Sequence, residues 1–196
     1  MLLSDEAQNL LFRDAHTTYG FTGEPVTDEE MRAVHDLVKY GPTAMNSQPL
    51  RVVLIRSEQA RERLTRHMAP GNQPKIGKAP LVAVLAADLD FHHELPRVFP
   101  VNPAAMENFD RDEAGRVATA RFNAGLQMGY FIVGLRAAGL AAGPMSGFDA
   151  DGLSKEFFPE GDHVAVAVVN IGRRAEQDAH FPRQHRLDFD EVVQVA

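Results

Sequence analysis

The chain has 196 residues, 44% of them hydrophobic and 24% charged, with a formal net charge of −7 at pH 7. This length suits one domain with a substantial core, and we expect a single domain over residues 1–196. The acidic balance argues against nucleic-acid binding, and no apolar run approaches the roughly 20 residues of a membrane span. Cysteine is absent, which excludes disulfides, thiolate metal sites and a cysteine nucleophile and fits a cytoplasmic protein.

The N-terminal part of the chain predicts three helices and a strand. The first helix is expected over residues 4–16, and Thr27 and Glu30 form the capping-box pattern that opens the second. The apolar run at 51–56 predicts a buried strand, and Ser57 is placed to cap the third helix. Helices and strands thus follow one another without an internal repeat or a linker.

The remainder of the chain predicts two more strands around a long helix. Residues 80–87 and 163–172 are apolar runs typical of central strands, and residues 88–112 are irregular and rich in Pro, His and Phe. The helix expected over 113–138 is apolar on several sides, which predicts burial all round. A short helix is expected over 149–157, with its first residue as the cap.

These elements predict an α+β fold, an α/β sandwich with few strands and long helices. One small subunit can hardly surround so apolar a helix, so we expect a homodimer in which buried helices cross the interface. The alternative is a monomer with one central core helix.

The segment 41–49 places polar side chains where the second helix ends and the first strand begins. Thr43, Asn46, Ser47 and Gln48 lie between two prolines. The pyrimidine edge of a flavin alternates acceptors with a donor, and side-chain amides offer both kinds of group. Prolines hold such a loop in place at little entropic cost on binding. The composition alone fits a polar turn that caps the helix equally well.

A second candidate, residues 141–149, follows the long helix. Two glycines and Pro144 allow the backbone to approach a flat ring closely, although a plain turn between helices has the same composition. The stretch is not a nucleophile elbow, because the residue two before Ser146 is proline rather than glycine.

The segment 41–49 closely resembles the Pro-Ser/Thr-x-x-Asn-x-Gln-Pro signature of the FMN-dependent nitroreductase family. Residues 71–75 and 141–149 match two further segments of that family, and the basic residues before Leu187 match its C-terminal pair. The resemblance implies a nitroreductase-like fold, with a mostly antiparallel sheet flanked by long helices in an intertwined homodimer.

The resemblance also assigns roles to individual residues. Asn72 and Lys75 would reach the N1/C2=O edge and ribityl chain of FMN, and the backbone N–H groups of Ser146 and Gly147 would meet flavin N5 and O4. The residues assigned to the cofactor are Arg13, His16, Thr17, Pro42, Thr43, Asn46, Gln48, Asn72, Lys75, Pro144, Met145, Ser146, Gly147, Arg183 and Arg186. Residues 42–48 would come from one subunit and the others chiefly from its partner.

The N-terminal phosphate motif departs from the family pattern. The family has Arg-x-Ser-x-Arg before a Phe, whereas here His16 stands where an Arg is expected, Thr17 takes the Ser position and Tyr19 replaces the second basic residue. We expect Arg13 to compensate by reaching the phosphate from one helical turn earlier.

The chain looks most like the branch named for malonic semialdehyde reductase and for NADH dehydrogenase/NAD(P)H nitroreductase. This implies ping-pong hydride transfer from NAD(P)H through flavin N5 to a small acceptor, such as malonic semialdehyde, which would become 3-hydroxypropionate. The alternatives are a broad nitro or quinone reductase, a non-catalytic flavin-binding protein and a flavin-free structural relative. His92, His93 and Glu94 lack zinc-type spacing, so we expect no metal site.

Overall fold

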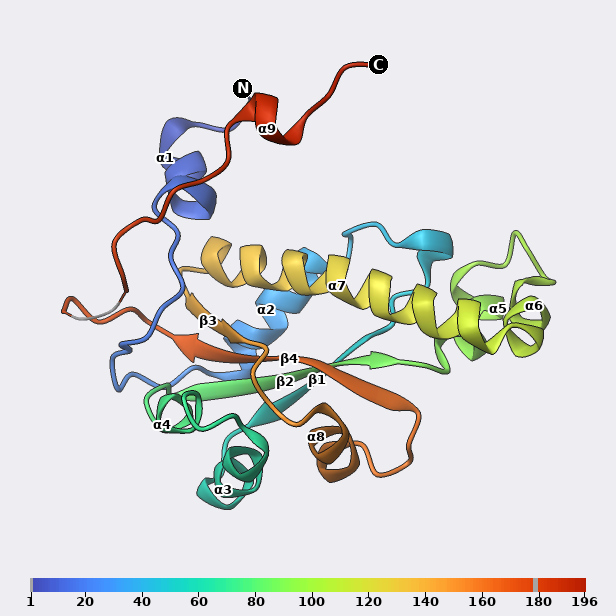
Figure 1. The fold of residues 1–196 in the computed structure, drawn as a ribbon, viewed down its shortest axis with the longest axis horizontal. Coiled ribbons are helices and arrows are strands. Elements are labelled where there is room, and N and C mark those ends of the chain that lie inside the picture. The colour runs from blue at the N-terminus through green and yellow to red at the C-terminus, as the bar shows by residue number, and fades with distance from the viewer. Residues whose placement is uncertain (1, 178–179) are drawn as a thin grey trace.

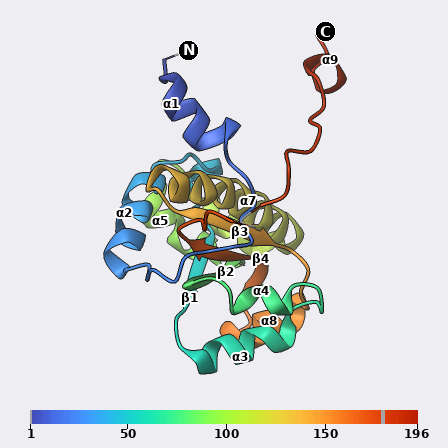
Figure 2. The same cartoon turned by 90° about the vertical axis from the view of Figure 1, so that its left-hand side faces the viewer.

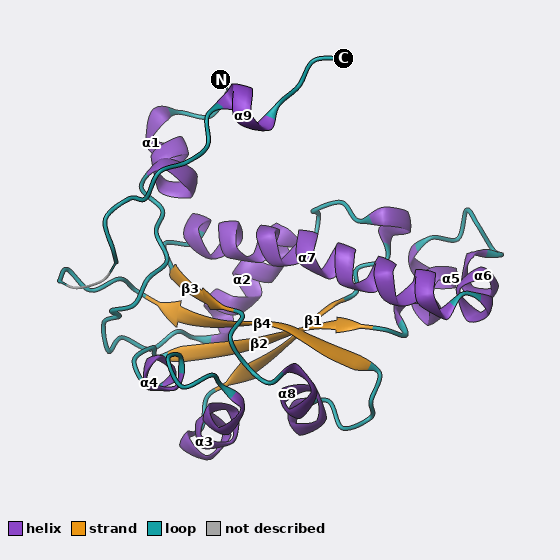
Figure 3. Ribbon diagram, in the orientation of Figure 1, coloured by secondary structure: helices purple, strands orange, loops and turns teal. Residues whose placement is uncertain are grey.

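A four-stranded antiparallel sheet forms the middle layer of the computed structural model, which describes residues 2–177 and 180–196. The strand order is β1-β2-β4-β3. The strands are β1 (Leu50–Ile55), β2 (Leu81–Asp88), β3 (Ala141–Met145) and β4 (His163–Gly172). Helices α2 (Asp28–Val38) and α7 (Glu113–Ala137) cover one face, and α3 (Glu58–His67) and α8 (Ala150–Phe157) cover the other (Figures 1 and 3). The predicted α+β sandwich is confirmed.

The core lies on both faces of β2, whose eight residues are all buried. Alternate side chains of a strand point to opposite faces. Leu81, Ala83 and Leu85 therefore join the cluster beneath α2 and α7, while Val82 and Val84 join the cluster above α3 and α8. The predicted strand at 51–56 forms as β1 but lies at the edge of the sheet, where Val52 is exposed.

The predicted helix starts are confirmed at three caps. The Thr27 hydroxyl accepts from the Glu30 N–H at 3.1 Å, and the Glu30 carboxylate accepts from the Thr27 N–H at 2.7 Å. Ser57 and Asp149 cap α3 and α8 by accepting hydrogen bonds from the Ala60 and Gly152 N–H groups, respectively. These short polar side chains satisfy backbone donors that the first turn of a helix leaves free.

Both ends of the chain extend beyond the sandwich. The first predicted helix is α1 (Asp5–Gln8), which continues as a π-helical stretch, η1 (Asn9–Arg13), and stops before His16. The short helix α9 (Phe189–Val192) closes the C-terminal segment. Figures 1 and 2 show α1 and α9 on the α7 side of the molecule, away from the sheet.

The stretch 88–112, which the sequence predicted to be irregular, contains short helices. These are η3 (Phe91–Glu94), α5 (Leu95–Val98) and α6 (Ala105–Arg111). Their periodicity is hard to read because each spans at most two turns. Phe91, Leu95 and Ala105 form a separate apolar cluster with Ala120 and Ala124 of α7. The candidate segment 141–149 likewise begins with a strand, since Ala141–Met145 pairs with β4 as β3.

Within one protomer, helix α7 is not buried on all sides, so the all-round burial predicted for it would need a partner subunit. Phe122 is 68% exposed and Leu126 is 38% exposed, and the neighbouring Gly125 and Gly129 have no atom within 4 Å of an added Cβ. The apolar side chains of α7 thus divide between a buried face, which carries Phe131 and others, and an open face. No helix among the described residues is long and apolar enough to cross a membrane.

Candidate functional site

A cavity of about 230 Å³ lies between residues 17–19 of the N-terminal segment, the short helix α4 (Gln73–Ile76) and the end of β3. We call it the Lys75 cavity. Its lining is Thr17, Thr18, Tyr19, Asn72, Lys75, Gly143, Pro144, Met145, Ser146, Gly147 and Asn170. The structure therefore brings together seven predicted residues from three separate segments of the chain.

Hydrogen bonds connect the two sides of the Lys75 cavity. The Lys75 ammonium donates to Asn72 Oδ1 at 2.8 Å, and Asn72 Nδ2 donates to the Gly147 carbonyl at 3.1 Å. A Cβ at Gly147 would lie 2.7 Å from Asn72 Nδ2, and one at Gly143 would lie 2.5 Å from the Thr18 carbonyl oxygen. Gly143 therefore requires glycine, because its neighbour is backbone, whereas a side chain at 147 would displace the Asn72 amide from its hydrogen bond.

A second cavity, of about 240 Å³, shares Thr17 and Tyr19 with the first. We call it the basic cavity. Its lining is Ala15, His16, Thr17, Tyr19, Arg136, Phe181, Pro182, Arg183, Gln184 and Arg186, which includes three guanidinium groups and, within residues 2–177 and 180–196, no carboxylate. Such a donor set suits a phosphate group. The predicted phosphate residues His16, Thr17, Arg183 and Arg186 thus lie together.

Arg13 does not line the basic cavity, although we predicted that it would reach the phosphate. Its guanidinium donates to Asp5, Gln8 and Asn9 within its own helical segment, because the π-helical turn places these acceptors nearby. The Arg13 carbonyl accepts a hydrogen bond from Arg183 instead. Arg136 of α7 supplies a guanidinium that the sequence analysis missed, since one arginine in a long helix carries no distinguishing pattern.

Partial burial, and after it the surrounding cations, disfavour the protonation of His16. Partial burial, followed by the neighbouring charges of His180, Arg183 and Arg174, lowers the pKa of His16. The His16 ring stacks on His180 with 4.0 Å between centroids, and its Nε2 lies 3.2 Å from an Arg183 nitrogen. An anion bound among these groups would favour the protonated imidazole, because it would offset the positive charges.

The predicted loop residues Pro42, Thr43, Asn46 and Gln48 lie elsewhere, at the join between α2 and β1. Asn46 Nδ2 donates to the Val98 carbonyl at 2.9 Å, and Gln48 Nε2 donates to Asn46 Oδ1 at 3.0 Å. Thr43 Oγ1 accepts from the Gln48 N–H, and the Pro42 carbonyl accepts from the Tyr130 hydroxyl.

This loop also has an unusual backbone. Met45, Asn46 and Gln48 have φ values of 52°, 51° and 44°, in the region that favours glycine. Such conformations cost free energy and persist only where the surroundings impose them. Asn123 of α7 contributes, because its Oδ1 accepts from the Ala44 N–H at 2.8 Å. No cavity described in the protomer is lined both by this loop and by Lys75.

Two further residues of the Lys75 cavity escaped the sequence analysis. Thr18 is buried and its N–H donates to the Ala142 carbonyl at 3.0 Å, which ties the N-terminal segment to β3. Asn170 is buried within β4. The signal for Asn170 is visible in the sequence, since it is the one polar residue inside the apolar run 164–171.

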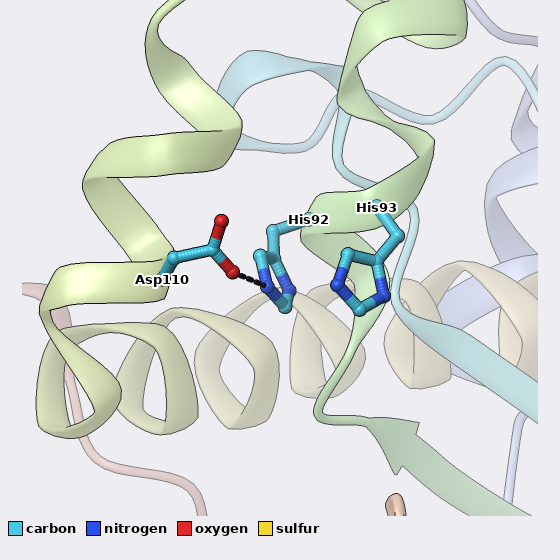
Figure 4. A group of neighbouring side chains, drawn as sticks. All are labelled: His92, His93 and Asp110. Atoms are coloured by element: carbon cyan, nitrogen blue, oxygen red, sulfur yellow. Dashed lines mark hydrogen bonds and ion pairs between the residues drawn. The ribbon is translucent and has the colours of Figure 1, made fainter.

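His92 and His93 come close together in η3, where their rings are tilted by 33° with centroids 4.2 Å apart. His92 is buried, and its Nε2 lies 2.9 Å from Asp110 Oδ1 of α6 (Figure 4). The three side chains converge with potential ligand atoms within 4.8 Å of one another. The His92–Asp110 contact also joins η3 to α6.

The fold and the clustered site define an α+β protein of the nitroreductase type. The sequence profile described as "Nitroreductase family" matches residues 13–173, so the chain belongs to the nitroreductase family.

Relatives in sequence and structure agree with this membership. A Streptomyces griseus protein, provisionally named NADH dehydrogenase/NAD(P)H nitroreductase, is 56% identical over 193 residues, covering 98% of this chain and 97% of its own. A Streptomyces coelicolor protein of the same provisional name is 57% identical with the same coverage. The structure of an Exiguobacterium sibiricum protein, described as a nitroreductase in complex with FMN, superposes with a TM-score of 0.85 at 18% identity, covering 100% of this chain and 99% of its own.

Proposed function

We propose that this protein is an FMN-dependent NAD(P)H oxidoreductase whose cofactor occupies the Lys75 cavity and the basic cavity. The observation that carries the proposal is that Thr17 and Tyr19 line both cavities, so that the two cavities adjoin. One cavity offers amides, a cation and close-packed backbone for a flat ring, and the other offers guanidinium groups for a phosphate.

The residues present fit FMN in chemistry as well as in arrangement. The positively charged lining of the basic cavity suits the phosphate, and the glycines at 143 and 147 let backbone approach the ring. Lys75 makes no ion pair among the described residues, so its charge is available to a ligand. Arg13 and residues 42–48 are not required by this half of the site.

Each group of residues then has a definable role. Arg183, Arg186, Arg136 and His16 anchor the phosphate, and Lys75 supports negative charge at the near edge of the ring. When bound, FMN accepts a hydride from NAD(P)H and passes it to the acceptor, so the protein's own contribution is binding, orientation and electrostatics. Because one open ring face would serve both reactants in turn, ping-pong kinetics are expected.

A homodimer would complete the site. Residues 42–48 lie apart from the Lys75 cavity in one protomer, so they reach the same cofactor only if a second copy supplies them. The open face of α7, with Phe122, Leu126 and two glycines, offers an apolar surface on which a partner can pack closely. The projecting segments α1 and α9 carry exposed apolar side chains that a partner would cover.

The acceptor is expected to be a small molecule. A small acceptor such as malonic semialdehyde and a broad range of nitro compounds or quinones fit an open ring face equally well. The relatives' provisional names point toward nitro compounds. The cytoplasmic location and the single domain over 1–196 stay predictions of the sequence.

The test begins with purified protein and FMN. We expect a bound flavin spectrum, thermal stabilisation by FMN, and steady oxidation of NADH or NADPH on adding menadione, nitrofurazone or malonic semialdehyde. A colourless protein that FMN neither stabilises nor shifts spectrally would refute the cofactor assignment. FMN binding without nicotinamide oxidation by any acceptor would favour the alternative of a non-catalytic flavin-binding protein.

A further inference from the structure

We propose that Asn170 is a positioning residue that fixes Lys75 beside the cofactor and thereby helps to set the cofactor's reduction potential. The inference rests on the FMN site proposed above and adds a residue that no sequence motif assigned to it. Asn170 lies on β4 and would act through Lys75 rather than by contacting the reacting atoms.

The first observation is the cost of placing Asn170 where it lies. It is 3% exposed and sits in the central part of the sheet, flanked by Val169 and Ile171, which are fully buried. A buried amide is unfavourable unless its polar atoms are hydrogen-bonded. Asn170 Oδ1 nevertheless has no partner among the described residues. The sheet's own backbone pairing with Val82 and Gly143 does not need this side chain.

The second observation is the one hydrogen bond that the Asn170 side chain makes with the described residues. Asn170 Nδ2 donates to the Lys75 carbonyl at 2.8 Å. Helix α4 has only four residues, too few to be stable alone, so tertiary contacts must hold it. Arg61 donates to the carbonyls of Ile76 and Pro80, beyond the C-terminal side of Lys75. Asn170 is therefore the link that joins the rigid sheet to the peptide of Lys75 itself.

A hydrogen-bonded chain carries this link across the cavity. It runs from Asn170 through Lys75 and Asn72 to the Gly147 carbonyl. The Lys75 ammonium bonds to a neutral amide oxygen, so its position depends on this chain and its charge is not neutralised by a carboxylate. Small displacements of the α4 backbone would move the ammonium relative to a bound ring.

The direction of the effect follows from charge. Two-electron reduction of FMN places negative charge near N1, and a nearby ammonium favours that form over the oxidised form. Loosening Lys75 should therefore weaken the binding of reduced FMN more than that of oxidised FMN. The midpoint potential of the bound cofactor then becomes more negative, because the potential reflects the ratio of the two dissociation constants.

The experiment measures that potential in a double-mutant cycle. The proteins are wild type, Asn170→Leu, Lys75→Gln and the double variant, each loaded with FMN and titrated spectroscopically against a reference dye. We expect Asn170→Leu to weaken reduced FMN about tenfold relative to oxidised FMN, a shift of about −30 mV for a two-electron couple. In the Lys75→Gln background the same substitution should shift the potential by less than a third of that amount.

Val168→Ala is the control for a general loss of stability. It removes buried volume from the same strand as Asn170 but does not alter the hydrogen bond to Lys75. This control should bind FMN with the wild-type potential. If Asn170→Leu does not fold, Asn170→Ser takes its place in the cycle.

Three outcomes decide the question. An unchanged potential in the Asn170 variant overturns the proposal, as does a shift of equal size with and without Lys75. A matching shift in Val168→Ala also overturns it, since the effect would then reflect stability alone. Failure of the wild-type protein to bind FMN would instead refute the proposed function on which the inference rests.

Discussion

The two halves of the predicted cofactor site use similar side chains in opposite ways. Around Lys75, amides and backbone line a cavity, and the ammonium bonds only to a neutral amide. In the loop 42–48, the amides of Asn46 and Gln48 bond to each other and to Val98. Polar composition thus identifies both segments, but only the structure shows that the first lines the Lys75 cavity of its own protomer and that the loop does not.

The largest expected effect comes from preventing the dimer that would bring the two halves of the cofactor site together. Gly129→Arg places a long cation on the open face of α7, where an added Cβ meets no atom within 4 Å. The protomer should fold, because arginine also favours the helix. We expect loss of the dimer and at least a hundredfold weaker FMN binding.

Size-exclusion chromatography with light scattering measures the mass, and FMN titration measures the affinity. Gly23→Arg is the matched control, since this loop glycine is also free of neighbours. A Gly129→Arg protein that is monomeric but binds FMN normally would show that residues 42–48 are not part of the site.

A smaller effect is expected from the phosphate anchor. Arg186→Ala removes one guanidinium from the basic cavity, and charge-assisted hydrogen bonds typically contribute about 1.5–3 kcal/mol. FMN binding should weaken about tenfold or more, whereas riboflavin, which lacks the phosphate, should bind the variant and the wild type alike. Isothermal titration with both ligands provides the comparison, and an equal loss for riboflavin would place Arg186 outside the phosphate site.

The pH dependence of binding tests His16 separately. Partial burial and nearby cations lower the pKa of His16 in the free protein. A bound phosphate raises that pKa, because it favours the imidazolium. FMN should therefore bind more tightly at pH values below the bound-state pKa of His16. Its affinity should fall as the pH rises from the free-state pKa to the bound-state pKa.

His16→Ala should remove this component and leave only the phosphate's own ionisation, which has a pKa of about 6 and acts in both proteins. Identical pH profiles for FMN binding to the two proteins would show that His16 does not take up a proton when the phosphate binds.

The smallest effect concerns the region 91–111, which contacts the loop through Asn46 and Val98. Asp110→Ala removes the partner of buried His92 Nε2, and leaving a buried polar atom unpaired costs about 1–3 kcal/mol. Thermal or urea unfolding should show this loss. Asp110→Asn, which keeps an acceptor, should cost less. Glu107→Ala, an exposed residue of the same helix, should cost under about 1 kcal/mol.

Local signals in the sequence predicted the parts of the fold that depend on local interactions. Thr27, Ser57 and Asp149 start helices because each hydroxyl or carboxylate satisfies nearby backbone donors. The central strands were equally readable, since both of their faces are apolar. The position of a strand within the sheet could not be predicted in the same way. An edge strand such as β1 and a central strand such as β2 differ in their neighbours more than in their residues.

The candidate site shows the same limit. Asn72, Lys75 and Gly147 were predicted from motifs and do lie together. Arg136 and Asn170 were not predicted, because their proposed roles arise from packing between segments distant in the chain. Arg13 was misplaced because the π-helical turn directs its guanidinium back to its own segment, and no sequence pattern specifies that geometry.

The pairing of β2 with β4 bears on how the chain is synthesised. The partner of β2 lies roughly 80 residues further along, beyond the whole of α7. At about 5–20 residues per second, several seconds pass after β2 is made before β4 follows it. During that interval a strand of eight buried residues, seven of them uncharged and apolar, has only β1 beside it. The nascent chain therefore passes through a period when self-association competes with folding, and slower translation would lengthen it.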